Sequence, residues 1–176
     1  MLTYEELKRI VSWQPYRDDW PVDRNKIDDN VKIYYGSLIE NFKFNDVFDS
    51  TITEDEGMGT FLEILCHTQE EKFFNENCIM VCISLCSPYA AYGQIKFSKD
   101  ENGMAWSWLD AETVGIIYDE KLKSIELEVI RILKNNNLIV IDNEYAKQEL
   151  PDELSKNIDS LHEGNQIINA LFQIMD

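Results

Sequence analysis

The chain has 176 residues, 44% of them hydrophobic and 11% aromatic, which suits one domain with a substantial core. Its 33 acidic and 16 basic residues give a formal charge of −17, so we expect neither nucleic acid nor an anionic membrane surface as a partner. The longest apolar stretch, residues 78–86, is far shorter than the ~20 residues that span a membrane.

The first predicted element is a helix that runs from Thr3 to about Trp13. Thr3 and Glu6 match a capping box, in which each side chain bonds the amide of the other residue. Leu2 and Leu7 stand where a hydrophobic staple would close on that cap. We expect a native start here and a cytoplasmic location, in which the four cysteines stay thiols.

A second helix follows the turn-rich segment 15–29, with Asp29 or Asn30 as its N-cap. Its apolar residues recur at the helical period. They are Val31, Tyr34, Tyr35, Leu38, Ile39 and Phe42. Beyond this helix we predict a strand in "TFLEILCH" (60–67), and "FNDVFDSTIT" (44–53) is a second candidate.

Three of the four cysteines lie at an even spacing in "CIMVCISLC", residues 78–86. Bulky aliphatic residues at odd positions alternate with smaller residues, which is typical of a central strand covered on both faces. Cysteines four residues apart in a strand lie ~13 Å from each other, too far to share a zinc ion or form a disulfide. We therefore predict that Cys78, Cys82 and Cys86 are core thiols. A metal or redox role would require a helix here.

The next stretch contains Asn102–Gly103, the dipeptide preferred in a two-residue type I′ hairpin. Folding about it sets Phe97 opposite Trp108 and segregates apolar from polar side chains. The apolar face carries Ile95, Phe97, Met104, Trp106 and Trp108. Joined to the cysteine strand, the hairpin gives an antiparallel meander over about residues 78–109, and we expect its tryptophans to pack on a helix.

The C-terminal part is predicted to be mainly helical. A third helix should run from Asp119 to Lys134, with Leu127 and Ile130 widening an apolar face that lies on the sheet. "NNN" at 135–137 tolerates the left-handed conformation that ends helices. "LIVID" (138–142) is predicted to be a short strand or an extended segment that returns over the core. The tail is predicted to hold two short helices, of which the last buries Ile168, Leu171 and Phe172.

These elements predict a single α+β domain over residues 1–176, in which N-terminal and C-terminal helices cover a central antiparallel sheet. Residues 1–43 form its helical N-terminal part. Strands dominate 44–110, and 111–176 is again helical.

No catalytic or cofactor motif stands out in the sequence. His67 lacks the helical two-histidine spacing of a zinc peptidase, and His162 reads as a solvated loop residue. The nucleophile-elbow, phosphate-loop and calcium-loop patterns are missing. We therefore predict no catalytic residue, cofactor or metal ion, and no enzymatic activity. A carboxylate-dependent or metal-dependent enzyme, with a site near His67, is a less favoured alternative.

Four stretches resemble a known family in residue character and in the order of their elements: "SPYAAYGQIKF", "WSWLDAETVG", "LKSIELEVIRILKNNNLIVIDNEYAKQEL" and "INALF". Together, over roughly residues 84–174, they resemble small acidic bacterial immunity proteins of the polymorphic-toxin type. Such proteins neutralise a toxin by binding it. The resemblance implies a non-enzymatic cytoplasmic inhibitor with a protein partner, and it transfers no binding residue position by position.

Two windows of the chain contain carboxylates and no Lys or Arg: eight carboxylates lie between Lys43 and Lys72, and six between Lys99 and Lys121. In the second window, an aromatic residue amid acids suits contact with a basic partner, such as a toxin domain. The candidate contact residues are Asp110, Glu112, Tyr118, Asp119 and Glu120. A solvated loop followed by acids at a helix N-terminus explains the same pattern. A housekeeping adaptor or regulatory domain, which could be a homo-oligomer, is the alternative function.

Overall fold

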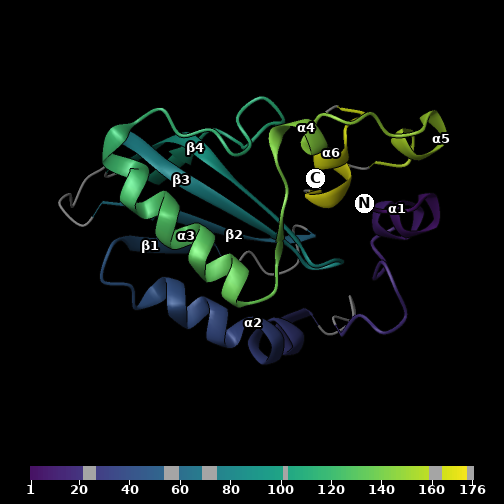
Figure 1. Cartoon of the computed structure of the whole chain (residues 1–176), viewed down its shortest axis with the longest axis horizontal. Helices are drawn as coiled ribbons and strands as arrows, with labels where there is room; N and C mark the ends of the chain where they lie inside the picture. Colours follow the sequence, from purple (N-terminus) through teal and green to yellow (C-terminus); the bar gives the residue numbers. More distant parts are fainter. Residues whose placement is uncertain (22–26, 54–59, 69–74, 101–102, 159–163, 174–176) are drawn as a thin grey trace.

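The computed structural model describes residues 1–21, 27–53, 60–68, 75–100, 103–158 and 164–173. Six strands within these residues form one sheet in the order β1-β2-β3-β4-β5, with β6 paired to β4 (Figure 1). The strands are β1 (Asp49–Thr53), β2 (Phe61–His67), β3 (Asn75–Ser84), β4 (Tyr89–Asp100), β5 (Gly103–Trp106) and β6 (Ile139–Val140). All neighbours are antiparallel except β4 and β6. The predicted meander is therefore part of a wider sheet.

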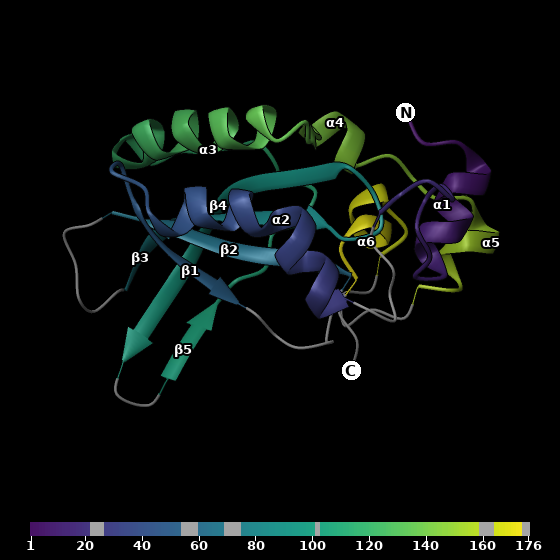
Figure 2. The same cartoon turned by 90° about the horizontal axis from the view of Figure 1, so that it is seen from below.

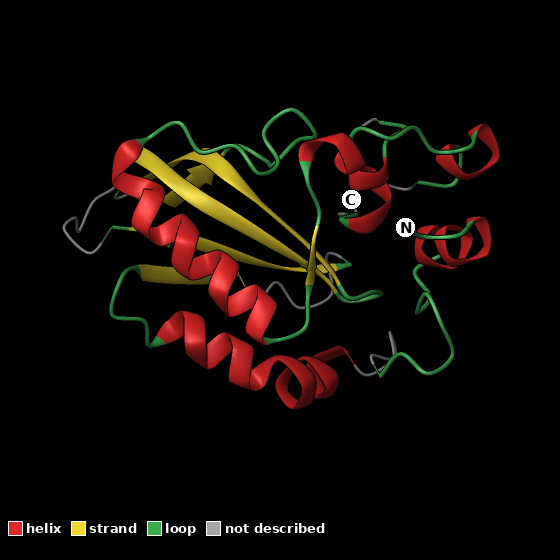
Figure 3. Cartoon of the chain, viewed as in Figure 1, coloured by secondary structure: helices red, strands yellow, loops and turns green. Residues whose placement is uncertain are grey.

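The helices form two groups on this sheet, which confirms the predicted α+β class. Figures 1 and 2 show α2 and α3 side by side along the sheet, and α1, α4, α5 and α6 gathered at one end. Figure 3 shows the same division by secondary structure. The helices are α1 (Tyr4–Val11), α2 (Ile27–Lys43), α3 (Lys123–Asn135), α4 (Asn143–Ala146), α5 (Asp152–Ser155) and α6 (Ile167–Leu171), with a 3₁₀ turn η2 (Glu120–Leu122) before α3. In the part of the chain that is described, no helix is both long and apolar enough to cross a membrane.

Strand β3 separates two hydrophobic clusters, as its alternating sequence predicts. Ile79 and Ile83 belong to the cluster that contains α2 and α3 side chains. Met80 and Cys82 belong to the cluster that contains α1 and α6 side chains. All four cysteines are buried and none of them forms a disulfide, so the prediction that the three in this stretch are core thiols is confirmed.

The first helix has the predicted cap. The Thr3 hydroxyl accepts from the Glu6 amide at 3.3 Å, and the Glu6 carboxylate accepts from the Thr3 amide at 2.8 Å. The helix ends at Val11, two residues before the predicted end, because Trp13 has a φ of 60° and turns the chain away.

The second helix begins earlier than its apolar pattern indicates. It starts at Ile27, so the predicted N-cap at Asp29 or Asn30 is wrong; periodicity locates the middle of a helix better than its ends. Tyr34 is 49% exposed, and the side chain of Val31 lies outside the described residues. The rest of the predicted stripe is buried: Tyr35, Leu38, Ile39 and Phe42.

The β4–β5 hairpin differs in register by two residues from the prediction. Phe97 pairs with Trp106, and β5 ends there, before Trp108. A shift of two residues leaves every side chain on its predicted face, so the face pattern could not distinguish the two registers. The turn rule for Asn102–Gly103 selected the wrong one; Asn102 itself lies outside the described residues. Trp108 is 38% exposed, and the side chain of Trp106 is not described.

The C-terminal elements follow the prediction with three corrections, the first being that α3 begins at Lys123, after η2, rather than at Asp119. Leu127 does not widen the apolar face of α3, because it is 71% exposed on the side of the helix away from Ile125 and Val129. Ile130 packs against the core as predicted. The predicted short strand is present as β6, and the tail contains three short described helices, α4 to α6, instead of two. The last of them buries the predicted residues Ile168, Leu171 and Phe172.

Candidate partner-binding surface

The candidate contact residues lie on a segment that runs along the outer edge of β4. β6 covers one end of that edge and β5 the other. Between them Gly93 bridges Val114, and the Gln94 amide donates to the Ile116 carbonyl at 3.1 Å. A Cβ on Gly93 would meet the Thr113 carbonyl oxygen, so only glycine allows this close approach. The segment is therefore fixed to the sheet at its middle.

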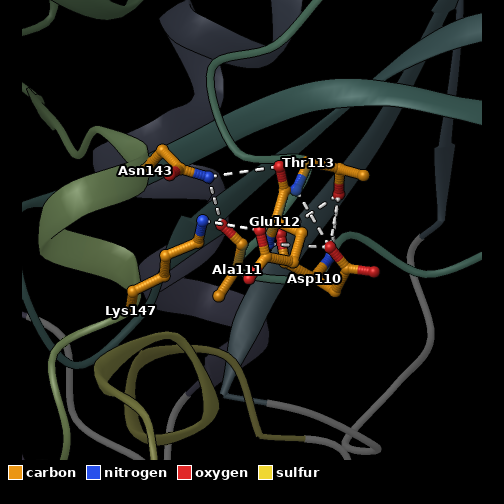
Figure 4. A network of polar contacts seen from close by, with 6 residues as sticks. All are labelled: Asp110, Ala111, Glu112, Thr113, Asn143 and Lys147. Atoms are coloured by element: carbon orange, nitrogen blue, oxygen red, sulfur yellow. Dashed lines mark hydrogen bonds and ion pairs between the residues drawn. The ribbon is translucent and has the colours of Figure 1, made fainter.

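A turn organises the first half of this segment (Figure 4). Asp110 Oδ1 accepts from the amides of Glu112 and Thr113, each at 2.9 Å, and from Thr113 Oγ1 at 3.0 Å. A carboxylate that accepts several local amide bonds holds a turn in shape. One oxygen of Asp110 therefore stabilises the turn. The sequence had predicted Asp110 as a partner contact.

Helix α4 supports the same turn from outside (Figure 4). Asn143 Nδ2 donates to the carbonyls of Ala111, at 2.5 Å, and Glu112, at 3.1 Å. Lys147 Nζ pairs with Glu112 Oε2 at 2.5 Å, although the Glu112 side chain is 74% exposed. An exposed pair of this kind is weak, so a partner cation can compete for the Glu112 carboxylate.

The second half of the segment is held by Gln94 of β4 and Asn77 of β3. Gln94 Oε1 accepts from the amides of Tyr118, at 2.8 Å, and Asp119, at 2.9 Å. Asp119 accepts from the Lys121 amide at 3.0 Å and from Asn77 Nδ2 at 3.3 Å. These two hydrogen bonds, the amide bond first, lower the pKa of Asp119. The carboxylate therefore stays charged at neutral pH beside a fixed backbone.

Tyr118 and Glu120 face solvent on either side of Asp119. The Tyr118 side chain is 73% exposed, and Glu120 is exposed as well. Asp110 and Glu112 lie against α4, whereas Tyr118, Asp119 and Glu120 lead into α3. In Figure 1 the segment spans the rim between these two helices. The structure thus places the five predicted residues on one segment but in two groups.

The residues that position this segment were missed by sequence reasoning. Gln94 and Asn77 act on groups 24 to 42 residues away, and Asn143 on groups 31 and 32 residues away. The one available signal was polarity: Gln94 interrupts an otherwise apolar run in β4. Thr113 could have been found locally, since an Asp followed three residues later by Thr favours a capped turn.

The thiols near the sheet centre are chemically quiet. Burial raises the pKa of Cys78 to about 12, and burial raises that of Cys66 and Cys82 well above the ordinary value. Protonated thiols are poor nucleophiles and poor metal ligands. Cys66 joins the cluster under α2 and α3, and His67, the next residue on β2, points to the opposite face.

Among the described residues, no three His, Cys, Asp or Glu side chains are grouped so that they could hold a metal ion. His67 is buried, with its Nδ1 3.3 Å from the Thr68 carbonyl. His162 lies outside the described residues. Comparison of the chain with protein-family models, curated proteins and solved structures gave no match.

Proposed function

We propose that this chain is an immunity protein that binds and neutralises a cognate basic toxin domain without catalysing a reaction. The observation that supports it most is the presentation of Tyr118. Its backbone is fixed by Gln94, while its ring is 73% exposed beside two carboxylates. An exposed aromatic side chain on a fixed backbone has few torsions to order on binding and forms a good anchor. The carboxylates of Asp119 and Glu120 favour a partner with Lys or Arg around its pocket.

The charge of the whole chain supports the same function. A formal charge of −17 attracts a positively charged partner over a distance, which can raise the association rate to ~10⁸ M⁻¹s⁻¹ at low salt. Such an inhibitor needs no catalytic group of its own. It acts by covering the basic cleft in which a toxin such as a nuclease would bind phosphates.

The test is binding to the product of the neighbouring gene, measured by biolayer interferometry between 50 and 500 mM NaCl (about 14 to about 4 Å of screening length). We expect a complex whose association slows as salt rises. Tyr118→Ala should weaken the complex by about tenfold or more, because it removes the aromatic anchor. The backbone amide of residue 118 still bonds Gln94 in this variant, so the segment keeps its place. Glu120→Lys should slow association more than Glu149→Lys, a matched change at another exposed acid.

Two results would contradict the proposal. One is the absence of any complex with the neighbouring product. The other is a complex that is insensitive to salt and unchanged by Tyr118→Ala and Glu120→Lys. Circular dichroism of each variant checks that the fold is retained. Growth of cells that express the toxin with each variant then reports neutralisation directly.

A further inference from the structure

The loop between α2 and β1 presents two apolar side chains to solvent. Phe44 is 81% exposed and Val47 is 42% exposed. On either side of them in the chain, Phe42 and Phe48 are fully buried, with ring centroids 5.9 Å apart. The core therefore fixes both ends of the loop while its middle points outward. We call Phe44 and Val47 the α2–β1 apolar pair.

Hydrogen bonds also hold the loop itself. Asn45 Nδ2 donates to Glu128 Oε1 on α3 at 3.0 Å and to the Asn41 carbonyl at 3.3 Å, and Asn45 Oδ1 accepts from the Val47 amide at 2.8 Å. Arg131 binds both oxygens of Glu128, at 2.6 and 2.7 Å. Side chains on a loop anchored this way are already arranged for contact, which lowers the entropic cost of binding.

The fold itself does not require the apolar pair. Neither residue belongs to a buried cluster, so polar residues there would leave the core unchanged. Single exposed apolar residues, such as Leu127, are ordinary on protein surfaces. Two of them three residues apart, on a loop that the Asn45 side chain ties to α3, are better suited to contact with another molecule.

The charges around the pair define the chemistry of that molecule. Exposed carboxylates of Glu40, Asp46 and Asp49 lie within four residues of the pair in the chain. Lys43 is the last basic residue before a window that contains none until Lys72. A second copy of this chain would bring the same carboxylates and a charge of −17 against them, which disfavours self-association.

We infer that the α2–β1 apolar pair is a second contact surface for a protein partner that offers an apolar pocket bordered by Lys or Arg. The inference rests on the proposed function, since it assigns the surface to the same partner. Both surfaces adjoin α3: Tyr118, Asp119 and Glu120 precede the helix, and Asn45 bonds Glu128 in its middle. One partner that covers α3 can therefore reach both.

The test measures the affinity of the neighbouring gene product for Phe44→Ala, Val47→Ser and the control Tyr4→Ala, which truncates another exposed aromatic residue, on α1 and away from α3. We expect Phe44→Ala to weaken binding by about tenfold or more, while Tyr4→Ala changes it by less than about twofold. The salt dependence of Phe44→Ala should stay that of the wild type, because no charge is changed. Thermal unfolding should be unaffected, since the side chain is exposed.

The failures of the two proposals differ. A complex that forms normally but tolerates Phe44→Ala and Val47→Ser overturns this inference and leaves the proposed function in place. No complex with the wild-type chain overturns both. A dimer in sedimentation analysis of the chain alone that dissociates on Phe44→Ala would assign the pair to self-association and overturn the inference as well.

Discussion

At the scale of single residues, the side chain of Gln173 joins the two ends of the chain. Its Oε1 accepts from Trp13 Nε1 at 3.0 Å, and its Nε2 donates to the carbonyls of Ala170, at 3.0 Å, and Ile10, at 3.3 Å. Its backbone amide donates to Thr60 Oγ1 at 3.0 Å. Gln173 is fully buried, so every one of these bonds replaces a bond to water.

Gln173→Ala should destabilise the protein by about 2–3 kcal/mol, because it leaves the Trp13 indole N–H buried without its partner and opens a small cavity. Urea unfolding followed by fluorescence measures the effect. Gln148→Ala, at an exposed position, is the control and should stay within about 0.5 kcal/mol of the wild type. Equal unfolding midpoints for the two variants would show that the buried network contributes little.

The thiols give a second residue-scale prediction. Iodoacetamide at pH 8 should leave Cys66, Cys78 and Cys82 unmodified in the native protein, because burial keeps them protonated and inaccessible. The same reagent in 6 M guanidinium (roughly twice as effective per molar as urea) should modify all of them. Mass spectrometry of tryptic peptides counts the labels. Rapid native labelling of Cys78 or Cys82 would contradict the assignment of these residues to the core.

At the scale of elements, α1 and α3 end in the same backbone motif with different residues. After α1, the amides of Trp13 and Gln14 donate to the carbonyls of Ile10 and Arg9. After α3, those of Asn137 and Leu138 donate to the carbonyls of Lys134 and Leu133. Both patterns are Schellman motifs, which place one residue at positive φ. That residue is Trp13, with a φ of 60°, after α1, and Asn137, with a φ of 58°, after α3.

Substitution by glycine should therefore have different effects at the two ends. Trp13→Gly relieves a backbone cost of about 1–2 kcal/mol but removes a buried indole worth about 3–5, so we expect a net loss of about 2–3 kcal/mol. Asn137 is exposed, and Asn137→Gly should stay within about 0.5 kcal/mol of the wild type. Asn137→Ala should cost about 1 kcal/mol. Denaturant unfolding of the three variants checks the order, and a stabilising Trp13→Gly would contradict it.

The elements were predictable where local rules agree with tertiary packing. The cap of α1, the central strand β3 and the left-handed residue after α3 were read from a few neighbouring residues. The hairpin register was not, because registers that differ by two residues present the same faces. Leu127 was misassigned because apolarity alone does not say which side of a helix meets the sheet; its angular position on α3 does.

The candidate surface was only partly predictable for the same reason. Its acids and Tyr118 stand together in the sequence and do lie on one exposed segment. What divides them into two groups is the pairing of the middle of the segment with β4 and the contacts from α4. Those contacts join residues far apart in the chain, and no local pattern encodes them.

At the scale of the whole molecule, repulsion among the acidic residues destabilises the folded state. Ion pairs with carboxylates are formed by described basic residues that include Arg9, Arg17, Lys123, Arg131 and Lys147. Each pair joins one acid and one base and leaves the formal net charge of −17 unchanged, so carboxylates on the surface repel one another at neutral pH. A basic partner that binds such a surface relieves the repulsion among its carboxylates. That relief adds to the free energy of binding. The unbound chain should then be more stable where the repulsion is weaker.

That balance predicts how stability depends on pH and salt. Three described carboxylates have pKa values lowered by folding: Glu6 by the Thr3 amide and Arg17, Asp119 by the Lys121 amide and Asn77, and Glu128, to about 2, chiefly by Arg131. Their stabilisation is present above the ordinary pKa values of 4.5 for Glu and 3.8 for Asp, and it is lost as pH falls through the lowered values. Protonation of the other surface acids instead relieves repulsion.

We therefore expect Tm to rise from pH 7 to about 5, where net charge shrinks. Below about pH 4 it should fall, because the unfolded chain then binds protons at the three carboxylates that the fold keeps charged. At pH 7, 0.5 M NaCl should raise Tm by about 4 °C, which corresponds to about 1 kcal/mol for a chain of this size. Near pH 5 the same salt should have little effect. Differential scanning calorimetry at the two pH values measures both trends. A Tm that falls with salt at pH 7 would show that the ion pairs stabilise the fold more than the repulsion destabilises it. A basic partner would then have no net repulsion to relieve on binding.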